Sequence, residues 1–510
     1  MVFVMKPNIV IVMTDQQRAD LRKSRGYPLD TMPFLDSLGH KGVDFEQAYT
    51  PCPTCLPARV SMFTGRYSES HRARTNHNGQ DAYYSTDMLE LLKAEGYTAA
   101  LCGKNHSHHP EADFDFAETC GHLGHEGNLP PETEADRRFA DFLDGTDHME
   151  MHRPAPGGVE AQHPYRNVSS AFSFLDAQSR ENPFFLWLSF AEPHNPYQVP
   201  EPYYDMFPPE SLPKIQTALQ DGEKKGHKFS WIDKVWQRVL GPDREARVDR
   251  ARSNYHGMLR LIDDQLKRFY TGLQERDLIR NTILIFVSDH GDFVGEYGLI
   301  RKGPDLPEVL TRIPCTWCGP GVAPRGTDPK HCVSLVDIFP TLCDIIGAEI
   351  PFGVQGKSIS PLLENQNIPE KEYQSAYAES GFGGLYWTEK DSLTLYEEGA
   401  SRPGKEPGSL QTFDCLNTWT QAGQVRMLRR GNYKIQLDML ENGYLYDLEN
   451  DPREMHNLFH DPVFTDIKAD MLAGLMAASL RACDPLPVPR HRYHYKRHPK
   501  GFWFAEDFTI

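Results

Sequence analysis

Two cysteines separated by two residues lie in the proline-rich stretch "PCPTCLPARV", residues 51–60. Redox-active thiol pairs and zinc sites use the same spacing. Cys55, however, is followed closely by Pro57, whose fixed backbone suits a first helical turn. We therefore expect Cys55 at the N-terminus of a helix that ends near Gly65. Anions and thiolates are stabilised at that position, which makes Cys55 the first candidate for a chemical role.

Paired thiols remain an alternative interpretation of this stretch. Cys52 and Cys55 have the spacing of a redox pair, and Cys315 with Cys318 would complete a four-cysteine zinc site. The second pair lies in an apolar segment that is typical of a buried strand. The chain has only ten cysteines in 510 residues, and their spacing is irregular. This usage favours reduced, mostly buried thiols over a disulfide framework.

Polar side chains follow two apolar runs at the point where each run ends. Asp15 and Gln16 come after "NIVIVM", and Asp289 with His290 comes after "ILIFV". The carboxyl ends of parallel strands form the ligand crevice of an open sheet, so these side chains are expected to converge. Their donor set is mostly oxygen, which suits calcium, magnesium or manganese. The alternative is that the aspartates only cap helices that follow.

These strands belong to a larger alternation of apolar runs and helical patterns. Continuous apolar strands separated by helices predict an α/β protein with a large, mostly parallel sheet flanked by helices. We expect this catalytic domain to cover residues 1–370, with a polar insertion at about 200–250. Hairpin-like segments then predict a smaller α+β domain with an antiparallel sheet at 371–484. Residues 485–510 are expected to form a C-terminal tail.

Charge and hydropathy limit the classes of partner. The formal net charge of −17 opposes binding to a polyanion such as nucleic acid. No segment reaches the roughly 20 unbroken apolar residues of a membrane span, and the N-terminus lacks the pattern of a secretory signal. We therefore expect a cytoplasmic protein. Residues 489–504 interleave basic and aromatic side chains, as single-strand binders do. Packing on a neighbouring subunit of a homo-oligomer, or at the mouth of the active site, is the preferred interpretation.

The stretch around Cys55 also resembles a known family signature. "CLPAR" followed by "VSMFTGR" is similar to the Cys-x-Pro-x-Arg and Thr-Gly-Arg pattern of type I sulfatases, which belong to the alkaline-phosphatase-like superfamily. In that family a maturation enzyme oxidises the cysteine to formylglycine. Further segments resemble the family in the same order along the chain. They are "PNIVIVMTDQ" (7–16), "GYTAALCGKNH" (96–106), "EPHNPY" (192–197), "VSDHGDFVGEYGLIRKG" (287–303) and "LYDLENDPREMHNL" (445–458).

The resemblance implies hydrolysis of a small anionic ester, a sulfate monoester, to an alcohol and inorganic sulfate. It implies a formylglycine made from Cys55 by a formylglycine-generating enzyme, and one divalent cation, calcium first, with manganese or magnesium as alternatives. Each role then falls on a matching residue. The metal ligands would be Asp15, Gln16, Asp289, His290 and residue 55, and Asp289 would also help to deprotonate the nucleophile. Arg59 and Lys104 would neutralise the reacting groups, and His106 would orient one hydroxyl of the hydrated formylglycine. His194 and Lys302 would contact the substrate and assist the leaving group, and Asn76 would line the substrate pocket.

Two positions depart from the common sulfatase pattern. Gln16 stands where many sulfatases have aspartate, and Ala58 where many have serine. Phosphonate monoester hydrolases and related phosphodiesterases, which share the fold and the formylglycine, have the same two residues. We therefore keep a phosphonate or phosphodiester hydrolase as the alternative. An unmatured family member that only binds ligands is a further alternative, and it predicts a free thiol at Cys55. The alcohol part of the substrate stays open.

Overall fold

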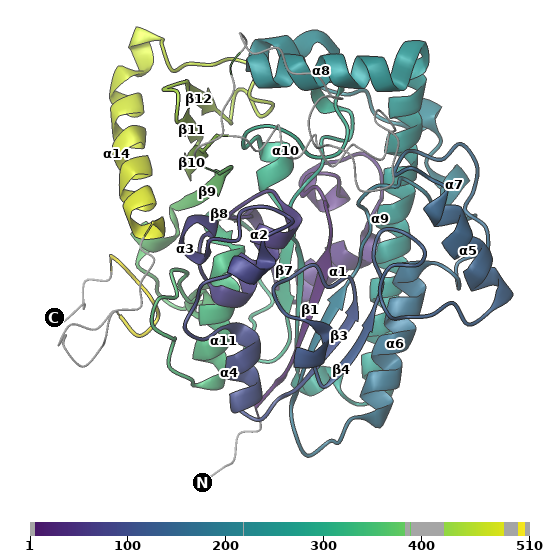
Figure 1. Cartoon of the computed structure of the whole chain (residues 1–510). Coiled ribbons are helices and arrows are strands. Elements are labelled where there is room, and N and C mark those ends of the chain that lie inside the picture. The colour runs from purple at the N-terminus through teal and green to yellow at the C-terminus, as the bar shows by residue number, and fades with distance from the viewer. Residues whose placement is uncertain (1–5, 218, 383–387, 389–422, 484–497, 505–510) are drawn as a thin grey trace.

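The computed structural model describes residues 6–217, 219–382, 388, 423–483 and 498–504. Its larger part is built on an eight-stranded sheet with the order β4-β3-β5-β1-β6-β7-β2-β8 (Figure 1). The strands are β1 (Asn8–Thr14), β2 (Val43–Tyr49), β3 (Thr98–Gly103), β4 (Phe116–Thr119), β5 (Phe184–Ser189), β6 (Thr282–Ser288), β7 (Cys315–Cys318) and β8 (Gly326–Ser334).

Helices cover both faces of this sheet because its central strands are apolar on both sides. Successive residues of β1 point to opposite faces, so Val10 and Val12 enter one apolar cluster while Ile9 and Ile11 enter the other. The first cluster includes residues of α1 (Pro33–Lys41), α6 (His163–Ala177) and α9 (Arg244–Glu275). The second includes residues of α2 (Cys55–Thr64), α4 (Met88–Ala94) and α11 (Ile338–Ile346). The predicted α/β class is thereby confirmed.

The strand β7 is the antiparallel member of this sheet. It pairs antiparallel with β6 and with β2, whereas the other pairs of neighbouring strands are parallel. Cys315 and Cys318 stand at its two ends, and burial raises the pKa of each thiol to about 12. Burial also raises the pKa of Cys52 to about 12. Within the described residues these thiols form no four-cysteine cluster, which agrees with buried, reduced cysteines.

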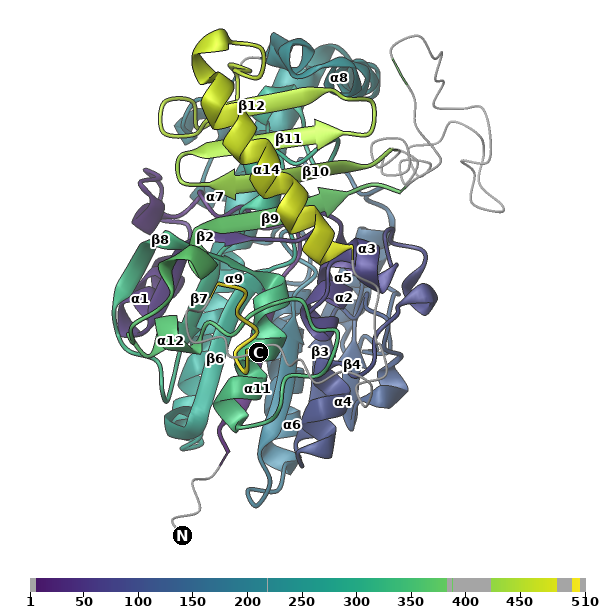
Figure 2. The same cartoon turned by 90° about the vertical axis from the view of Figure 1, so that its left-hand side faces the viewer.

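A second sheet follows in the C-terminal part of the chain. Its strands β9 (Ser375–Ser380), β10 (Val425–Arg430), β11 (Tyr433–Asp438) and β12 (Gly443–Asp447) are antiparallel, in the order β12-β11-β10-β9. The helix α14 (Thr465–Ala482) crosses one face of this sheet (Figure 2). On the side of the larger sheet, Glu379 donates its backbone N–H to the Pro51 carbonyl over 2.9 Å, and Lys434 pairs with Glu308 at 3.0 Å. The predicted small antiparallel sheet is thus present.

Six further α-helices lie in the described residues. They are α3 (Ser68–His71), α5 (Glu134–Asp144), α7 (Tyr203–Met206), α8 (His227–Leu240), α10 (Glu308–Thr311) and α12 (Ser360–Leu363). None of the helices in the described part of the chain is both long enough and apolar enough to cross a membrane. Most of the basic and aromatic segment 489–504 lies outside the described residues.

Candidate active site

The ends of β1 and β6 bring the predicted acidic residues together. The two strands pair in parallel up to Thr14 and Ser288, so Asp15 and Asp289 both follow at the same edge. The backbone N–H of Gln16 donates to Oδ1 of Asp289 over 3.0 Å. These residues are completely buried. The convergence expected from two parallel strand ends is therefore present in the fold.

The helix α2 presents Cys55 to this edge. Thr54, just before the helix, is extended, and Gly65 ends it in the left-handed conformation with φ of 62°. The Cys55 thiol lies 3.5 Å from Asp15 Oδ1 and 3.1 Å from Lys302 Nζ. Asn76 Oδ1 accepts the N–H of Leu56 in the first turn over 3.1 Å. Asn76 thus stabilises the start of the helix that carries Cys55.

The charges around Cys55 favour an anion at this position. Burial and Asp15 oppose ionisation of the thiol. Lys302, Lys104 and His290 outweigh them and hold the pKa of Cys55 well below its usual value. A negatively charged group at the position of this sulfur would meet the same cations.

The residues at the two strand ends fit a divalent cation. His290 donates from Nδ1 to the Gly291 carbonyl over 2.9 Å, which leaves Nε2 as an acceptor 3.7 Å from Asp15 Oδ1 and 3.8 Å from Asp289 Oδ1. Nε2 is also 3.2 Å from the Cys55 sulfur. Gln16 Oε1 is buried and has no hydrogen-bond partner. Two carboxylates, an unpartnered amide oxygen and an oriented imidazole are suitable ligands for such an ion.

Arg59 holds both carboxylates from the protein interior. Its Nε lies 3.0 Å from Asp289 Oδ2, and one terminal nitrogen lies 3.2 Å from Asp15 Oδ2. The other terminal nitrogen donates to Ser189 Oγ over 2.9 Å and to the backbone carbonyl of Lys104 over 3.2 Å. The guanidinium is fully buried. Arg59 therefore compensates the two acids while fixing their orientation.

A basic wall with two stacked histidines lies beside Asp15. Lys104 contacts Asp15 and lies 2.6 Å from Nε2 of His122. The rings of His122 and His194 stack with centroids 3.8 Å apart. Burial, with Lys302 and Lys104 nearby, holds the pKa of His194 well below its usual value despite Asp15. Cationic side chains and imidazoles thus gather where the ester group of a substrate would meet Cys55.

His106 lies at the edge of this group. Its Nε2 is 3.4 Å from the main-chain oxygen of Asn76, and its backbone has φ of 39°. The structure therefore places His106 next to the segment that supports the first turn of α2. Its predicted role of orienting a hydroxyl stays a prediction.

Two residues of this site were missed by the sequence analysis. Asp292 accepts the side-chain amide of Gln16 over 2.5 Å and the hydroxyl of Tyr197 over 2.7 Å. Its place two residues after His290, in "SDHGD", was a usable signal. His122 lies in the segment 120–127, whose sequence carries no pattern that predicts a contact with Lys104.

Comparison with known proteins decides the family. The model of the family "Sulfatase" matches residues 7–348. The chain belongs to the sulfatase family. This sulfatase is 30% identical to an arylsulfatase of Clostridium perfringens (strain 13 / Type A) over 478 residues, which cover 87% of this chain and 95% of that protein. It is therefore a sulfuric ester hydrolase, as the motifs predicted.

Solved structures show the fold of this sulfatase. The phosphonate monoester hydrolase of Agrobacterium radiobacter superposes with a TM-score of 0.73 at 21% identity, covering 94% of this chain and 96% of that one. A second structure, solved with its substrate D-glucosamine-2-N,6-O-disulfate, superposes with a TM-score of 0.64 at 18% identity, covering 94% and 98%. Both likenesses extend over nearly the whole sulfatase, and the predicted alkaline-phosphatase-like fold is confirmed.

Proposed function

We propose that this sulfatase hydrolyses a sulfate monoester with a formylglycine made from Cys55 and one divalent cation. The observation that carries the proposal is the position of Cys55. It lies at the N-terminus of α2, 3.1 Å from Lys302 and 3.5 Å from Asp15, among residues that suit a cation. A formylglycine-generating enzyme would act on the signature from Cys55 to Arg66 before the chain folds.

The cation would be held by Asp15, Gln16, Asp289 and His290, together with residue 55. When bound, it would polarise the oxygens of the substrate and favour the deprotonated nucleophile. Calcium is the first candidate. Gln16 in place of an aspartate removes one negative charge from this ligand set, which favours manganese as the alternative.

Formylglycine in its hydrated form supplies two hydroxyls on one carbon: one attacks sulfur and displaces the alcohol, and deprotonation of the other releases sulfate and restores the aldehyde. The side chains of this protein would support both steps by neutralising charge and assisting the leaving group. Lys104 and Lys302 place positive charge beside the sulfate oxygens, and Lys302 carries protons next to the ester oxygen. His194 lies on the same side and assists departure of the alcohol.

The state of residue 55 is the first test. Protein co-expressed with a formylglycine-generating enzyme should yield a peptide 42–59 whose mass matches an aldehyde or its hydrate at residue 55. The same protein should hydrolyse an aryl sulfate, and the Cys55→Ala variant should not. An unmodified thiol after co-expression would instead favour the inactive, ligand-binding alternative.

A phosphonate monoester or phosphodiester hydrolase is the second candidate. Gln16 and Ala58 favour it, and the superposition on a phosphonate monoester hydrolase is compatible with it. The matured enzyme should be assayed with an aryl sulfate, an aryl phosphonate monoester and an aryl phosphodiester that share one leaving group. The highest kcat/KM on the sulfate supports the proposal. A higher value on the phosphonate or the diester would replace it.

A further inference from the structure

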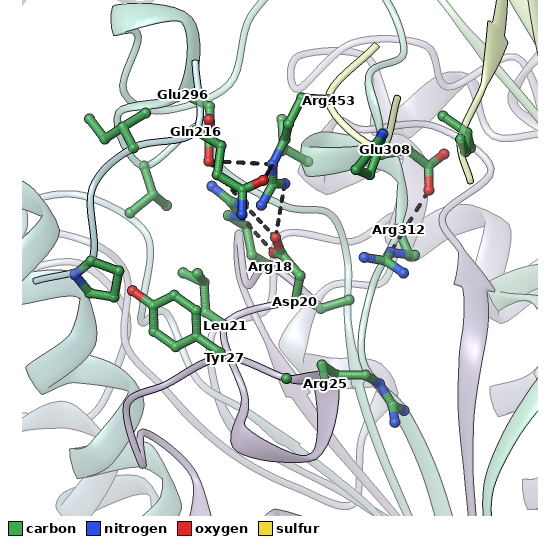
Figure 3. A pocket seen from close by; sticks show the side chains of 18 of the residues that line it. Arg18, Asp20, Leu21, Arg25, Tyr27, Gln216, Glu296, Glu308, Arg312 and Arg453 are labelled. Atoms are coloured by element: carbon green, nitrogen blue, oxygen red, sulfur yellow. Dashed lines mark hydrogen bonds and ion pairs between the residues drawn. The ribbon is translucent and has the colours of Figure 1, made fainter. Parts of the chain in front are cut away.

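A cavity of about 410 Å³ is lined by residues outside the candidate active site. Figure 3 shows this cavity from close by. It is lined by the loop that follows β1, by the end of β2, by residues of the insertion and α9, and by the C-terminal sheet region around Arg453. The proposed metal ligands, Cys55, Lys104, His194 and Lys302 are not among its lining residues. Apart from Cys55 on α2, these residues follow the carboxyl ends of β1, β3, β5 and β6. The cavity is instead lined in part by residues of β2.

The lining of this cavity carries an excess of positive charge. Six arginines and one lysine line it, against four carboxylates. The chain as a whole has the opposite sign, with a formal net charge of −17. The volume of the cavity is within the range of pockets that bind small molecules, and the cavity is larger than a single inorganic oxyanion needs.

On one wall of the cavity, the charged side chains neutralise one another through ion pairs. Asp20 pairs with Arg18 at 2.6 Å and with Arg453 at 3.0 Å, and Glu296 lies 3.7 Å from each of these arginines. Gln216 accepts a further hydrogen bond from Arg453 over 2.7 Å. Figure 3 shows this network grouped on one side of the cavity. Two cations and two carboxylates compensate each other there, so this wall does not need an anionic ligand.

Arg312 and Arg25 lie on another side of the cavity, where the ion pairing of Arg312 is looser. Arg312 has an ion pair with Glu308 at 3.8 Å, but Glu308 is already held by Lys434 at 3.0 Å and by the Tyr49 hydroxyl at 3.0 Å. Lys434 also pairs with Glu454 at 3.0 Å. The contact of Arg312 is thus the longer of the two ion pairs that Glu308 makes. The side chain of Arg312 is 25% exposed and, in Figure 3, stands away from the network around Arg453.

Arg25 lies on the same side of the cavity as Arg312. Arg25 pairs with Asp44 at 2.8 Å, and Asp44 also pairs with Arg22 at 3.1 Å. Arg22 has a second partner in Asp36 at 2.8 Å. Burial lowers the pKa of Arg25, and the nearby cations Arg22 and Arg312 lower it further, while the carboxylates of Asp44 and Glu46 oppose this shift. The cations on the Arg25 and Arg312 side are thus paired with carboxylates, but Arg312 is held only loosely, by the 3.8 Å contact with Glu308.

We propose that this cavity is a second ligand site, which binds a small organic oxyanion of the size of a sulfated or phosphorylated monosaccharide. Arg312 binds the oxyanion, because its planar guanidinium offers paired donors to sulfate or phosphate oxygens. Tyr27 and Pro213, which also line the cavity, contact the body of the ligand. Sulfate and phosphate esters share this chemistry, and the experiment below separates them.

Calorimetric titration of the full chain tests this site. The Cys55→Ala variant is used as parent so that no sulfate ester is consumed, and the probes are glucose 6-sulfate, glucose 6-phosphate and glucose. We expect saturable binding of at least one ester and none of glucose. The ester that binds more tightly identifies the preferred oxyanion. Absence of saturable binding for both esters would overturn the proposal.

Substitutions then locate the binding. In the same parent, Arg312→Gln should weaken ester binding about tenfold or more, which corresponds to roughly 1.4 kcal/mol. Arg312→Lys, which keeps the charge but loses the planar fork, should fall between Arg312→Gln and the parent. Arg280→Gln removes the same charge at an exposed position outside the cavity and should bind as the parent does. Unchanged binding by Arg312→Gln with an unaltered melting temperature would assign the ester to the active site and refute the second site.

Discussion

Gln16 donates its side-chain amide to Oδ2 of Asp292 over 2.5 Å, and this bond decides which way the amide group points. The same carboxylate oxygen accepts the Tyr197 hydroxyl, so Asp292 is itself held in place. Gln16 Oε1 is left buried and without a partner. A glutamine is a neutral ligand whose amide oxygen binds a cation, but rotation of the amide group can put its NH2 group in that place instead. Asp292 removes that ambiguity by binding its nitrogen.

We predict that Asp292→Ala weakens cation binding about 10- to 100-fold, the usual cost of losing a residue that orients a metal ligand. The measurement is calorimetric titration of the chelator-treated protein with calcium and with manganese. Asp30→Ala removes an exposed carboxylate and serves as the matched control. Equal cation affinity in the two variants would show that Gln16 needs no such orientation, or is no ligand.

Arg59 should be essential for stability as well as for activity. Arg59→Ala leaves Asp15 and Asp289 buried without their shared cation, and we expect a loss of about 3–5 kcal/mol in the free energy of unfolding. Urea unfolding in the absence of added metal measures it. Arg280→Ala, at an exposed position, should change stability by less than about 0.5 kcal/mol. A similarly small effect of Arg59→Ala would mean that the acids are neutral in the folded protein.

His122 is expected to act by positioning Lys104. His122→Phe keeps an aromatic ring against His194 but removes the contact with Lys104 Nζ, which is 2.6 Å long. A hydrogen bond to a charged group contributes about 1.5–3 kcal/mol, so kcat/KM for an aryl sulfate should fall roughly 10- to 100-fold. His456→Phe, with a side chain that is 80% exposed, is the control. The mass of the peptide 42–59 must match in both variants, and unchanged kinetics at equal maturation would contradict the role.

Buried neutral histidines should make the protein sensitive to acid. His256 lies 2.6 Å from the Tyr27 hydroxyl, and burial lowers its pKa to about 4. The unfolded chain binds a proton near pH 6.5 and the folded protein does not, so His256 contributes stability above pH 6.5 that is lost as the pH falls toward 4. The loss from this residue is about 3 kcal/mol, at 1.36 kcal/mol for each pKa unit.

The check is the free energy of unfolding of the native protein and of His256→Gln, measured by urea between pH 7 and pH 4. Carboxylates also titrate there, so the difference between the two proteins isolates this histidine. The variant should show the shallower decline. Parallel curves would mean that His256 keeps an ordinary pKa in the folded state.

The sequence by itself determined the local elements that carry the chemistry. Continuous apolar runs define β1 and β6, and an aspartate follows directly after each strand, so Asp15 and Asp289 could be assigned to one edge of a sheet. Pro57 and Gly65 mark the first turn and the end of α2, which places Cys55 at a helix start. These features depend on residues a few positions apart, so periodicity and helix-capping preferences are sufficient to predict them.

Only the tertiary structure decided which distant residues contact these elements. Gln16 and Asp292 are separated by 276 positions, and no local pattern states that one will orient the other. The antiparallel direction of β7 and the stacking of His122 on His194 likewise depend on the order of strands and loops. The cavity around Arg312 is formed by segments from both sheets. Contacts of this kind arise from the packing of distant segments, which local preferences leave undetermined.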